Sequence, residues 1–350
     1  AGLNDGTTYT ITVALTADAA GNTATSDTGD SLIYDVTLPT LGIVMASNNA
    51  DTSKAKTGDN IVLTITPTES VTLLVCTIDG EATTMGGSGT SWTSTLTLSG
   101  DETEQSTVFS CASHLDAAGN AGVTDTSVTS GAVTVDRTLP TLGIAMASNN
   151  ADTTKAKSGD NIVLTITPTE AVTALVCTID GEATTMGGSG VSWTSTLTLS
   201  GDETAGAAAI SCSSFLDAAG NAGATDTSAT SGSVTIDVTL PTLTIAMASN
   251  NAQAATQATS GNNIVLTITA SESVTLLVCT IDGEATTMGG STTAWTSTLT
   301  LSGDETPGNA VFSCASFKDA TGNVGTTDTS ASSGTVNIDY AVPTLGIVMS

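Results

Sequence analysis

Apolar and polar side chains alternate with a period of two along much of this chain. Ile61, Leu63 and Ile65 are separated by one residue each, and the segment 91–98 alternates threonine with Trp92, serine or leucine. Successive side chains of a β-strand point to opposite faces, so this period is typical of strands with one buried face. The other face is rich in threonine, whose branched Cβ suits a pleated sheet. The pattern predicts half-buried strands.

Seven such strands are expected within about 100 residues, with turn clusters rich in Gly, Asp and Asn between them. They cover residues 41–46, 60–67, 71–78, 81–85, 91–98, 107–114 and 131–136. Strands this short and this closely spaced, with no helical period, favour a β-sandwich of the immunoglobulin-like (Ig-like) type. We therefore expect an all-β protein built from Ig-like β-sandwich domains.

The sequence repeats itself. Pro39, Pro140, Pro241 and Pro343 each precede Thr-Leu and follow one another at intervals of 101, 101 and 102 residues. A unit of about 100 residues can hold its own core, unlike the short repeats of a solenoid. We expect the end of a preceding domain, three whole repeats, and the first strand of a following domain. The corresponding ranges are 1–38, 39–137, 138–238, 239–340 and 341–350.

The linkers between repeats are short. Asp136 to Pro140 is representative, and proline fixes its own φ angle while restricting the residue before it. A linker of this length cannot behave as a flexible coil. We therefore expect each domain to have the neighbouring domains of the same chain as partners and to stand end to end with them in an extended rod.

Charge excludes several functions. The 350 residues carry 34 acidic and only six basic side chains, a formal net charge of −28, and one histidine. Nucleic acids and anionic membranes need basic patches, so neither is expected as a partner. One histidine leaves few constellations for acid–base or metal-dependent catalysis, and we expect no enzyme activity. No apolar run approaches the roughly 20 residues of a membrane-spanning helix.

Each repeat has two cysteines 35 residues apart. Val13 of the leading segment aligns with Cys111 and falls on an apolar face with Tyr9 and Ile11, so Cys111 should point inward, as should Cys76 beside Leu74 and Ile78. The simplest consequence is one disulfide per repeat, joining Cys76 to Cys111, Cys177 to Cys212 and Cys279 to Cys314.

A disulfide closing a loop of this length contributes roughly 3–4 kcal/mol and indicates an oxidising, extracellular setting. Two buried free thiols per repeat, cross-links between chains and metal binding are the alternatives. Inward-facing cysteines disfavour cross-links, and the absence of a second Cys pair or partner His disfavours a metal.

Several segments resemble a known family. They are 46–50 (Ala-Ser-Asn-Asn-Ala), 56–63 (Lys-Thr-Gly-Asp-Asn-Ile-Val-Leu), 69–71 (Glu-Ser-Val), 115–120 (Leu-Asp-Ala-Ala-Gly-Asn) and 135–140 (Val-Asp-Arg-Thr-Leu-Pro). Together they resemble the tandem Ig-like repeats of giant surface proteins, found in bacterial adhesins and in marine microbial surface proteins. The resemblance implies extracellular display on a cell surface and a stalk whose modules supply length.

The resemblance also implies that Ca²⁺ could lie near the domain junctions. The matching acidic residues are those of the Asp-Ala-x-Gly-Asn loops and those just before each linker, namely Asp18, Asp35, Asp116, Asp136, Asp217, Asp237, Asp319 and Asp339. Calcium takes about six to eight oxygens, so carbonyls and waters would have to complete the shell. The alternative is purely structural, because Asp and Asn beside Gly also form Asx turns.

The third repeat differs at one loop. The second repeat keeps the four charged residues that the first repeat has at this loop, Asp51, Lys54, Lys56 and Asp59. Residues 253–262 of the third repeat carry no charge. Anions and cations disappear together, which suits a balanced group of surface ion pairs better than calcium ligands.

These observations favour a structural role, as the repetitive shaft of an extracellular filament, surface appendage or giant surface protein. Self-assembly into filaments is compatible with the small, uniform side chains. The alternative is an adhesin stalk or binding module that contacts receptors or glycans, in which case the loops should differ between repeats. The loops 78–80 and 85–89 barely change.

Overall fold

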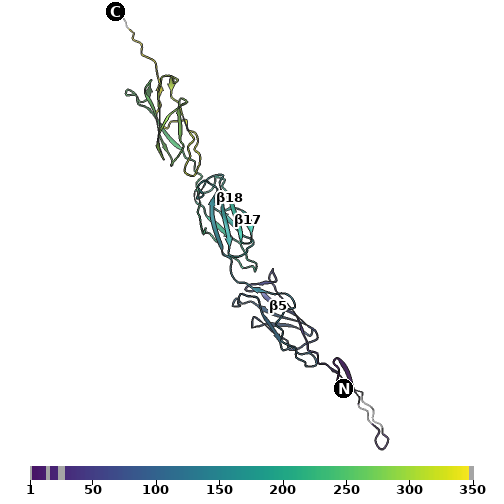
Figure 1. Cartoon of the computed structure of the whole chain (residues 1–350). Coiled ribbons are helices and arrows are strands. Elements are labelled where there is room, and N and C mark those ends of the chain that lie inside the picture. The colour runs from purple at the N-terminus through teal and green to yellow at the C-terminus, as the bar shows by residue number, and fades with distance from the viewer. Residues whose placement is uncertain (1, 13–15, 23–27, 347–350) are drawn as a thin grey trace. The chain divides into compact units, whose positions relative to one another are not determined.

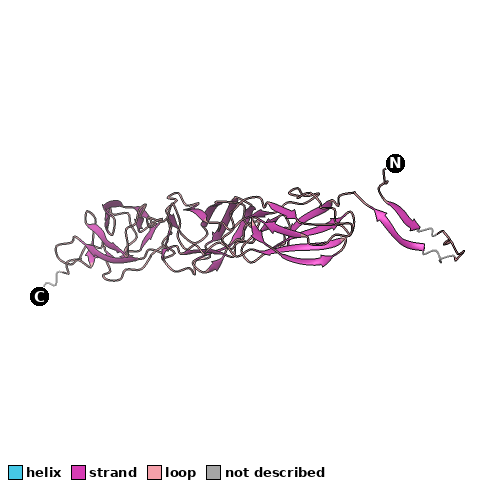
Figure 2. Ribbon diagram, turned by 90° about the horizontal axis from the view of Figure 1, so that it is seen from below, coloured by secondary structure: helices cyan, strands magenta, loops and turns pink. Residues whose placement is uncertain are grey.

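The computed structural model describes residues 2–12, 16–22 and 28–346, and every regular element in that part of the chain is a β-strand (Figure 2). No helix within these ranges is long and apolar enough to cross a membrane. The all-β expectation is confirmed.

The chain divides into two compact units. The first comprises Ala1–Thr141, Glu170–Leu175 and Ser214–Ala224, and the second comprises Leu142–Thr169, Val176–Ser213 and Thr225–Ser350. The first unit therefore holds the leading segment, the first repeat and two loops of the second repeat. The second unit holds the strands of the second repeat and the third repeat, which run from teal to yellow in Figure 1.

The leading segment is a two-stranded antiparallel ribbon. Strand β1 (Thr7–Thr12) pairs with β2 (Thr28–Tyr34), with Thr7 opposite Tyr34. Val13, whose alignment with Cys111 predicted that this cysteine points inward, lies outside the described residues.

The first repeat is a sandwich of a four-stranded and a three-stranded sheet. The four-stranded sheet has the order β3-β5-β9-β8, the facing sheet has the order β10-β6-β7, and β4 pairs with β11. The strands are β3 (Leu41–Ser47), β4 (Lys54–Ala55), β5 (Asn60–Pro67), β6 (Val75–Ile78), β7 (Glu81–Ala82), β8 (Thr84–Ser88), β9 (Ser91–Thr97), β10 (Phe109–Ala112) and β11 (Thr134–Val135).

The other two repeats have the same order in the two main sheets, and each adds a short strand, β19 or β29, beside the last strand of the repeat. In the second repeat the strands are β12 (Leu142–Ser148), β13 (Lys155–Ala156), β14 (Asn161–Pro168), β15 (Val176–Ile179), β16 (Glu182–Ala183), β17 (Thr185–Ser189), β18 (Ser192–Thr198), β19 (Gly206–Ala207), β20 (Ile210–Ser213) and β21 (Thr235–Ile236). In the third they are β22 (Leu243–Ser249), β23 (Gln257–Ala258), β24 (Asn263–Ala270), β25 (Val278–Ile281), β26 (Glu284–Ala285), β27 (Thr287–Ser291), β28 (Ala294–Thr300), β29 (Gly308–Asn309), β30 (Phe312–Ala315) and β31 (Asn337–Ile338).

The alternating side chains divide as the sequence pattern predicts. On β5, Ile61, Leu63 and Ile65 are fully buried, whereas Thr64 and Thr66 face solvent. The three buried side chains of β5 pack with residues of the facing sheet, including Cys76 and Cys111. The third repeat has an equivalent core. Each of these repeats therefore has its own hydrophobic core, as an Ig-like domain requires.

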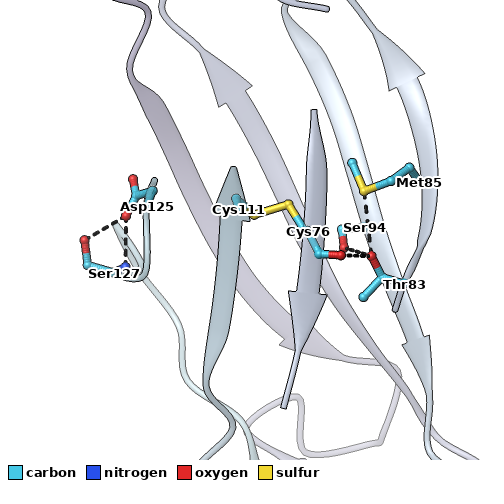
Figure 3. The surroundings of a disulfide bond; sticks show 7 residues. All are labelled: Cys76, Thr83, Met85, Ser94, Cys111, Asp125 and Ser127. Carbon is cyan, nitrogen blue, oxygen red and sulfur yellow. Dashed lines mark hydrogen bonds between the residues drawn. A yellow bond between two sulfur atoms is a disulfide. The ribbon is translucent and has the colours of Figure 1, made fainter. Parts of the chain in front are cut away.

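One predicted strand, 81–85, is divided between the two sheets. Residues 81–82 pair with β6 and residues 84–88 pair with β9, so the chain changes sheets at Thr83. The Thr83 hydroxyl donates to the carbonyl oxygen of Cys76 at 2.9 Å and accepts from the Ser94 hydroxyl at 2.6 Å (Figure 3). This side chain joins the two sheets where the backbone crosses between them.

Two other predicted strands, 71–78 and 107–114, are shorter than expected. Leu73 and Ser113 both adopt φ near 60°, a left-handed conformation that interrupts a strand. Beyond them, Thr72 and Leu115 pair again as an isolated bridge. The predicted strand 131–136 is reduced to β11, and the two-residue β4 was not predicted at all. Residues 341–346 form no strand, and the rest of the predicted strand 341–350 lies outside the described residues.

Candidate functional site

The Asp-Ala-x-Gly-Asn loops contact the linker that precedes their own repeat. Asn120 donates through Nδ2 to the backbone carbonyl oxygen of Asp35 at 3.1 Å, Asn221 to that of Asp136 at 3.0 Å, and Asn323 to that of Asp237 at 2.8 Å. The first two contacts lie within the first compact unit and the third within the second. One asparagine therefore holds each linker at an equivalent backbone position.

The aspartate of the same loop shapes the turn that presents this asparagine. Asp116 accepts the backbone N–H of Asn120 at 2.8 Å through Oδ1 and its side-chain amide at 2.7 Å through Oδ2. Burial would raise the pKa of Asp116, but these and further hydrogen bonds hold it below its ordinary value. The Asx turn considered as the structural alternative is present, and the same aspartate also faces the preceding linker.

Three carboxylates come together at each linker. Asp35, Glu69 and Asp116 form the first group, Asp136, Glu170 and Asp217 the second, and Asp237, Glu272 and Asp319 the third. In each group, one carboxylate oxygen from each residue lies within 4.8 Å of one carboxylate oxygen of the other two. We call these groups the junction triads. Six of the eight predicted aspartates belong to them.

The glutamate of each triad was missed by the sequence analysis. Burial raises the pKa of Glu69, Glu170 and Glu272, and the neighbouring aspartates raise it further. The signal was present, since a glutamate recurs at this position in all three repeats, but only the fold brings it beside two aspartates. Mutual repulsion among three carboxylates is what a bound divalent cation would relieve.

The remaining two predicted aspartates do not join a triad within the described ranges. Asp18 closes an Asx turn, accepting the N–H groups of Ala20 and Asn22. Asp339 accepts the N–H of Ala341 at 2.8 Å. Both occupy positions equivalent to triad members, but neither belongs to a group of three carboxylates in the part of the chain that the structure describes.

A second asparagine contact reinforces the junction. Asn49 donates through Nδ2 to Asp59 at 2.8 Å and to the carbonyl oxygen of Ala219 at 2.7 Å, and all three residues belong to the first unit. In the second unit, Asn150 makes the equivalent bonds to Asp160 and to the Thr321 carbonyl oxygen. The loop that precedes β4 or β13 therefore contacts the Asp-Ala-x-Gly-Asn turn of the following repeat.

The charged residues of this loop form the expected ion pairs in the second repeat. Lys155 lies 3.8 Å from Asp152, and Lys157 lies 3.7 Å from Asp160. Lys155 also approaches the carbonyl oxygen of Ala320 at 3.5 Å, so the charged loop is part of the junction and not only of the free surface.

The structure joins Cys76 to Cys111 by a disulfide (Figure 3). It likewise joins Cys177 to Cys212 and Cys279 to Cys314. Cys76 and Cys111 are directly opposite each other on the neighbouring strands β6 and β10. The backbone N–H and C=O of Cys111 bond to Asp125 on its other side, so the two cysteines form a non-hydrogen-bonded cross-strand pair. The bridge thus lies within one sheet, with both sulfurs in the core.

The fold defines the chain as a tandem array of Ig-like β-sandwich domains. No protein-family model matches the chain, and no curated protein matches it. Among solved structures, it is similar to a three-domain I-band fragment of titin, with 9% identity, coverage of 88% of this chain and 100% of that chain, and a TM-score of 0.39.

It is also similar to the full ectodomain of mouse nectin-like molecule 4, which has three Ig domains. That likeness has 12% identity, coverage of 83% of this chain and 99% of that chain, and a TM-score of 0.29. Scores and identities this low carry no argument about function.

Proposed function

We propose that this chain is a segment of an extracellular structural shaft, belonging to a filament, surface appendage or giant surface protein of the bacterial or marine microbial type. The observation that carries the proposal is the junction. Each linker is held by an asparagine from the following repeat, and Asn49 and Asn150 add a contact from the preceding one. Because the same contacts recur at successive junctions, the repeats add length to the chain without adding a free hinge at each linker.

The disulfides support an extracellular location. Such bonds persist in oxidising compartments, and here each repeat has its own. The repeats also keep the same loops, which suits modules that supply length more than modules that each recognise a different ligand. No catalytic role is part of this proposal.

Electron microscopy and small-angle scattering of the purified chain test the shaft. We expect extended particles of uniform length, and Asn221→Ala should broaden the distribution of end-to-end distances by freeing one linker. Asn22→Ala, in the leading segment, is the matched control. A wild-type chain that is compact or freely bent at its linkers would refute the proposal. Specific binding to cells or glycans by such bent particles would support an adhesin module instead.

We further propose that the junction triads bind Ca²⁺. Each supplies three carboxylates within 4.8 Å, and the raised pKa of its glutamate reflects burial and uncompensated negative charge. Hard oxygen ligands of this kind suit calcium, with carbonyls and waters completing the shell. A bound ion would join the linker aspartate to two residues of the following repeat and so stiffen the junction.

Thermal unfolding with and without Ca²⁺ tests this second proposal. Without calcium, Glu170→Gln should leave stability unchanged or raise it, because the variant removes repulsion between carboxylates. With calcium, the same variant should be less stable than wild type, because it lacks a ligand. Glu182→Gln, an equal change of charge on the exposed strand β16, should show no such reversal. A wild-type melting temperature unmoved by calcium would disprove the site.

A further inference from the structure

The outer face of each four-stranded sheet carries no charged side chain of its own strands in any of the three repeats, all of which lie within the described residues. In the first repeat, the residues of β3, β5, β9 and β8 that point away from the core are threonine, serine, glycine, alanine, valine and asparagine. Gly86, Thr93, Thr64 and Val44 form one row across this sheet. We call this surface the neutral face, together with its equivalents on β12, β14, β18 and β17 and on β22, β24, β28 and β27 (β17 and β18 are labelled in Figure 1).

The neutral face has little relief. Gly86 has no side chain, and a Cβ there would lie 2.8 Å from the Thr93 hydroxyl, so the glycine leaves room for this threonine. The equivalent glycines of the other two repeats have the same relationship at 2.9 Å. An even surface of small side chains allows a partner to approach closely.

Some polar groups of the neutral face bond to one another. The Thr97 hydroxyl donates to Oδ1 of Asn60 at 2.7 Å, and the equivalent pairs of the other repeats have distances of 2.7 and 2.8 Å. Covering a polar group is costly when it is left without a hydrogen-bond partner. These pairs keep their hydrogen bond when the face is covered, so they add little to that cost.

Charge indicates what kind of partner suits this surface. The chain has a formal net charge of −28, so two copies repel each other wherever their carboxylates meet. A basic partner would be attracted to the acidic loops and not to an uncharged sheet. The neutral face is a broad surface on which two copies can meet without bringing carboxylates together.

The area of the face favours a partner that covers more than one repeat. Strands of about seven residues, at about 3.3 Å per residue and about 4.8 Å apart, give each four-stranded face roughly 450 Å². One pair of faces would bury about 900 Å² in total, less than the roughly 1,200–2,000 Å² of a stable interface, whereas three pairs would bury about 2,700 Å².

We propose that the neutral faces are the surfaces through which two copies of this chain associate side by side. Thr64, Thr165 and Thr267 mark the same point of the face at intervals of 101 and 102 residues. A second copy has the same spacing, so it can meet all three faces and gains affinity with each additional pair. The inference goes beyond the shaft proposal, because a single chain can serve as a shaft.

Sedimentation velocity of the full chain in EDTA, over a range of sodium chloride concentrations, tests the association. EDTA prevents calcium from bridging carboxylates, which separates this test from the calcium proposal. Raising the salt from about 0.1 M to about 1 M shortens the Debye length from about 10 Å to about 3 Å and so weakens the repulsion between two polyanions. We expect the monomer fraction to fall as the salt rises. A chain that stays monomeric at every salt concentration would overturn the inference.

Substitutions on the neutral face locate the contact. In a symmetric contact the same face lies on both sides, so a charge introduced there meets its own copy. Thr64→Glu should therefore raise the dissociation constant about tenfold or more, because juxtaposed like charges oppose association. The set Thr64→Glu, Thr165→Glu and Thr267→Glu should leave the chain monomeric.

The matched control places the same charges on the other sheet. Thr77→Glu, Thr178→Glu and Thr280→Glu change the half-buried, outward threonines of β6, β15 and β25. This set should associate at high salt almost as wild type does. Equal loss in both sets, or loss in the control set alone, would refute a contact through the neutral face. Melting temperatures at low salt, where the chains are monomeric, establish that each variant is folded.

A charge swap tests the same contact by restoring it. Lysine at positions 64, 165 and 267 should prevent self-association as glutamate does, whereas a mixture of the lysine and glutamate chains should associate, because opposite charges then meet across the interface. A mixture that stays monomeric would count against the proposal. Compact or bent particles in the scattering experiment at low salt would instead refute the shaft and leave this contact unaffected.

Discussion

Gly131 lies directly against the backbone of Met45. A Cβ atom on Gly131 would be 2.1 Å from the Met45 carbonyl oxygen, and the glycine has φ +84°, a left-handed conformation. Gly232 and Gly334 have the same relationship to Met146 and Met247. This glycine lets the chain pass from its pairing with β3 at Ser130 to its pairing with β4 at Thr134.

Gly131→Ala should therefore destabilise the first repeat strongly. The left-handed conformation alone costs about 1–2 kcal/mol for a residue with a Cβ, and the clash adds to this. Chemical denaturation followed by Trp92 fluorescence, with the other two tryptophans changed to phenylalanine, reports on this repeat. Gly58→Ala is the matched control, because Gly58 has φ +90° with open space around it. Equal losses for the two variants would show that the close contact with Met45 costs nothing.

His114 occupies a position that is phenylalanine in the other repeats. Its side chain is 1% exposed, as are those of Phe215 and Phe317, and all three lie under a glycine. Nε2 lies 3.3 Å from the Pro39 carbonyl oxygen, whereas Nδ1 is buried without a hydrogen-bond partner. An unsatisfied buried polar atom costs about 1–3 kcal/mol.

We accordingly expect His114→Phe to stabilise the first repeat by about 1–3 kcal/mol. The same Trp92 assay measures it, and the second and third repeats provide the precedent for phenylalanine at this site. A loss of stability would mean that the contact with Pro39 outweighs the unsatisfied nitrogen.

Acid should weaken the third repeat in a way that depends on Tyr340. Burial pulls the pKa of Glu305 upward, but hydrogen bonds from the Tyr340 hydroxyl and from the N–H groups of Ser302 and Gly303 lower it from 4.5 to about 2. A carboxyl whose pKa is lowered by folding stabilises the folded state above its ordinary pKa. That contribution is lost as the pH falls from 4.5 toward about 2.

Tyr340→Phe should raise the pKa of Glu305, reduce stability at neutral pH and make the loss on acidification smaller. Denaturation followed by Trp295 fluorescence at about pH 6 and about pH 3 checks this, given the linkage between pKa and stability. The second repeat, which has Val238 at the equivalent position and is reported by Trp193, should not change. An acid response identical in wild type and variant would contradict the assignment.

Reducing the disulfide should lengthen each opened repeat. Cys76 and Cys111 are 35 residues apart, and the chain between them cannot extend while the bridge is intact. A fully extended chain spans about 3.4 Å per residue, so the reduced repeat should release about 120 Å more than the oxidised one. Single-molecule extension with and without reductant measures this, and replacing both cysteines with serine should reproduce the reduced value in one repeat only. An unchanged extension would mean that the bridge does not restrain the segment between the two cysteines.

The sequence by itself determined the length of the repeat, the all-β fold class and the inward orientation of the cysteines. Each follows from local order, because side chains alternate along a strand and a recurring cassette repeats its own spacing. Even the divided strand 81–85 was placed within three residues of the two strands that the structure has there, β7 and β8. What the alternation could not show is that Thr83 carries the chain from one sheet to the other.

Only the tertiary structure decided the contacts between distant segments. In the sequence Glu69 has the character of an ordinary loop residue, and only the fold places it beside Asp35 and Asp116. Nothing in the sequence around Asn49 predicts its hydrogen bond to Ala219. The left-handed Leu73 and the two-residue strand β4 depend on partners far along the chain. Such features arise from proximity in space, which a periodic pattern of side chains does not encode.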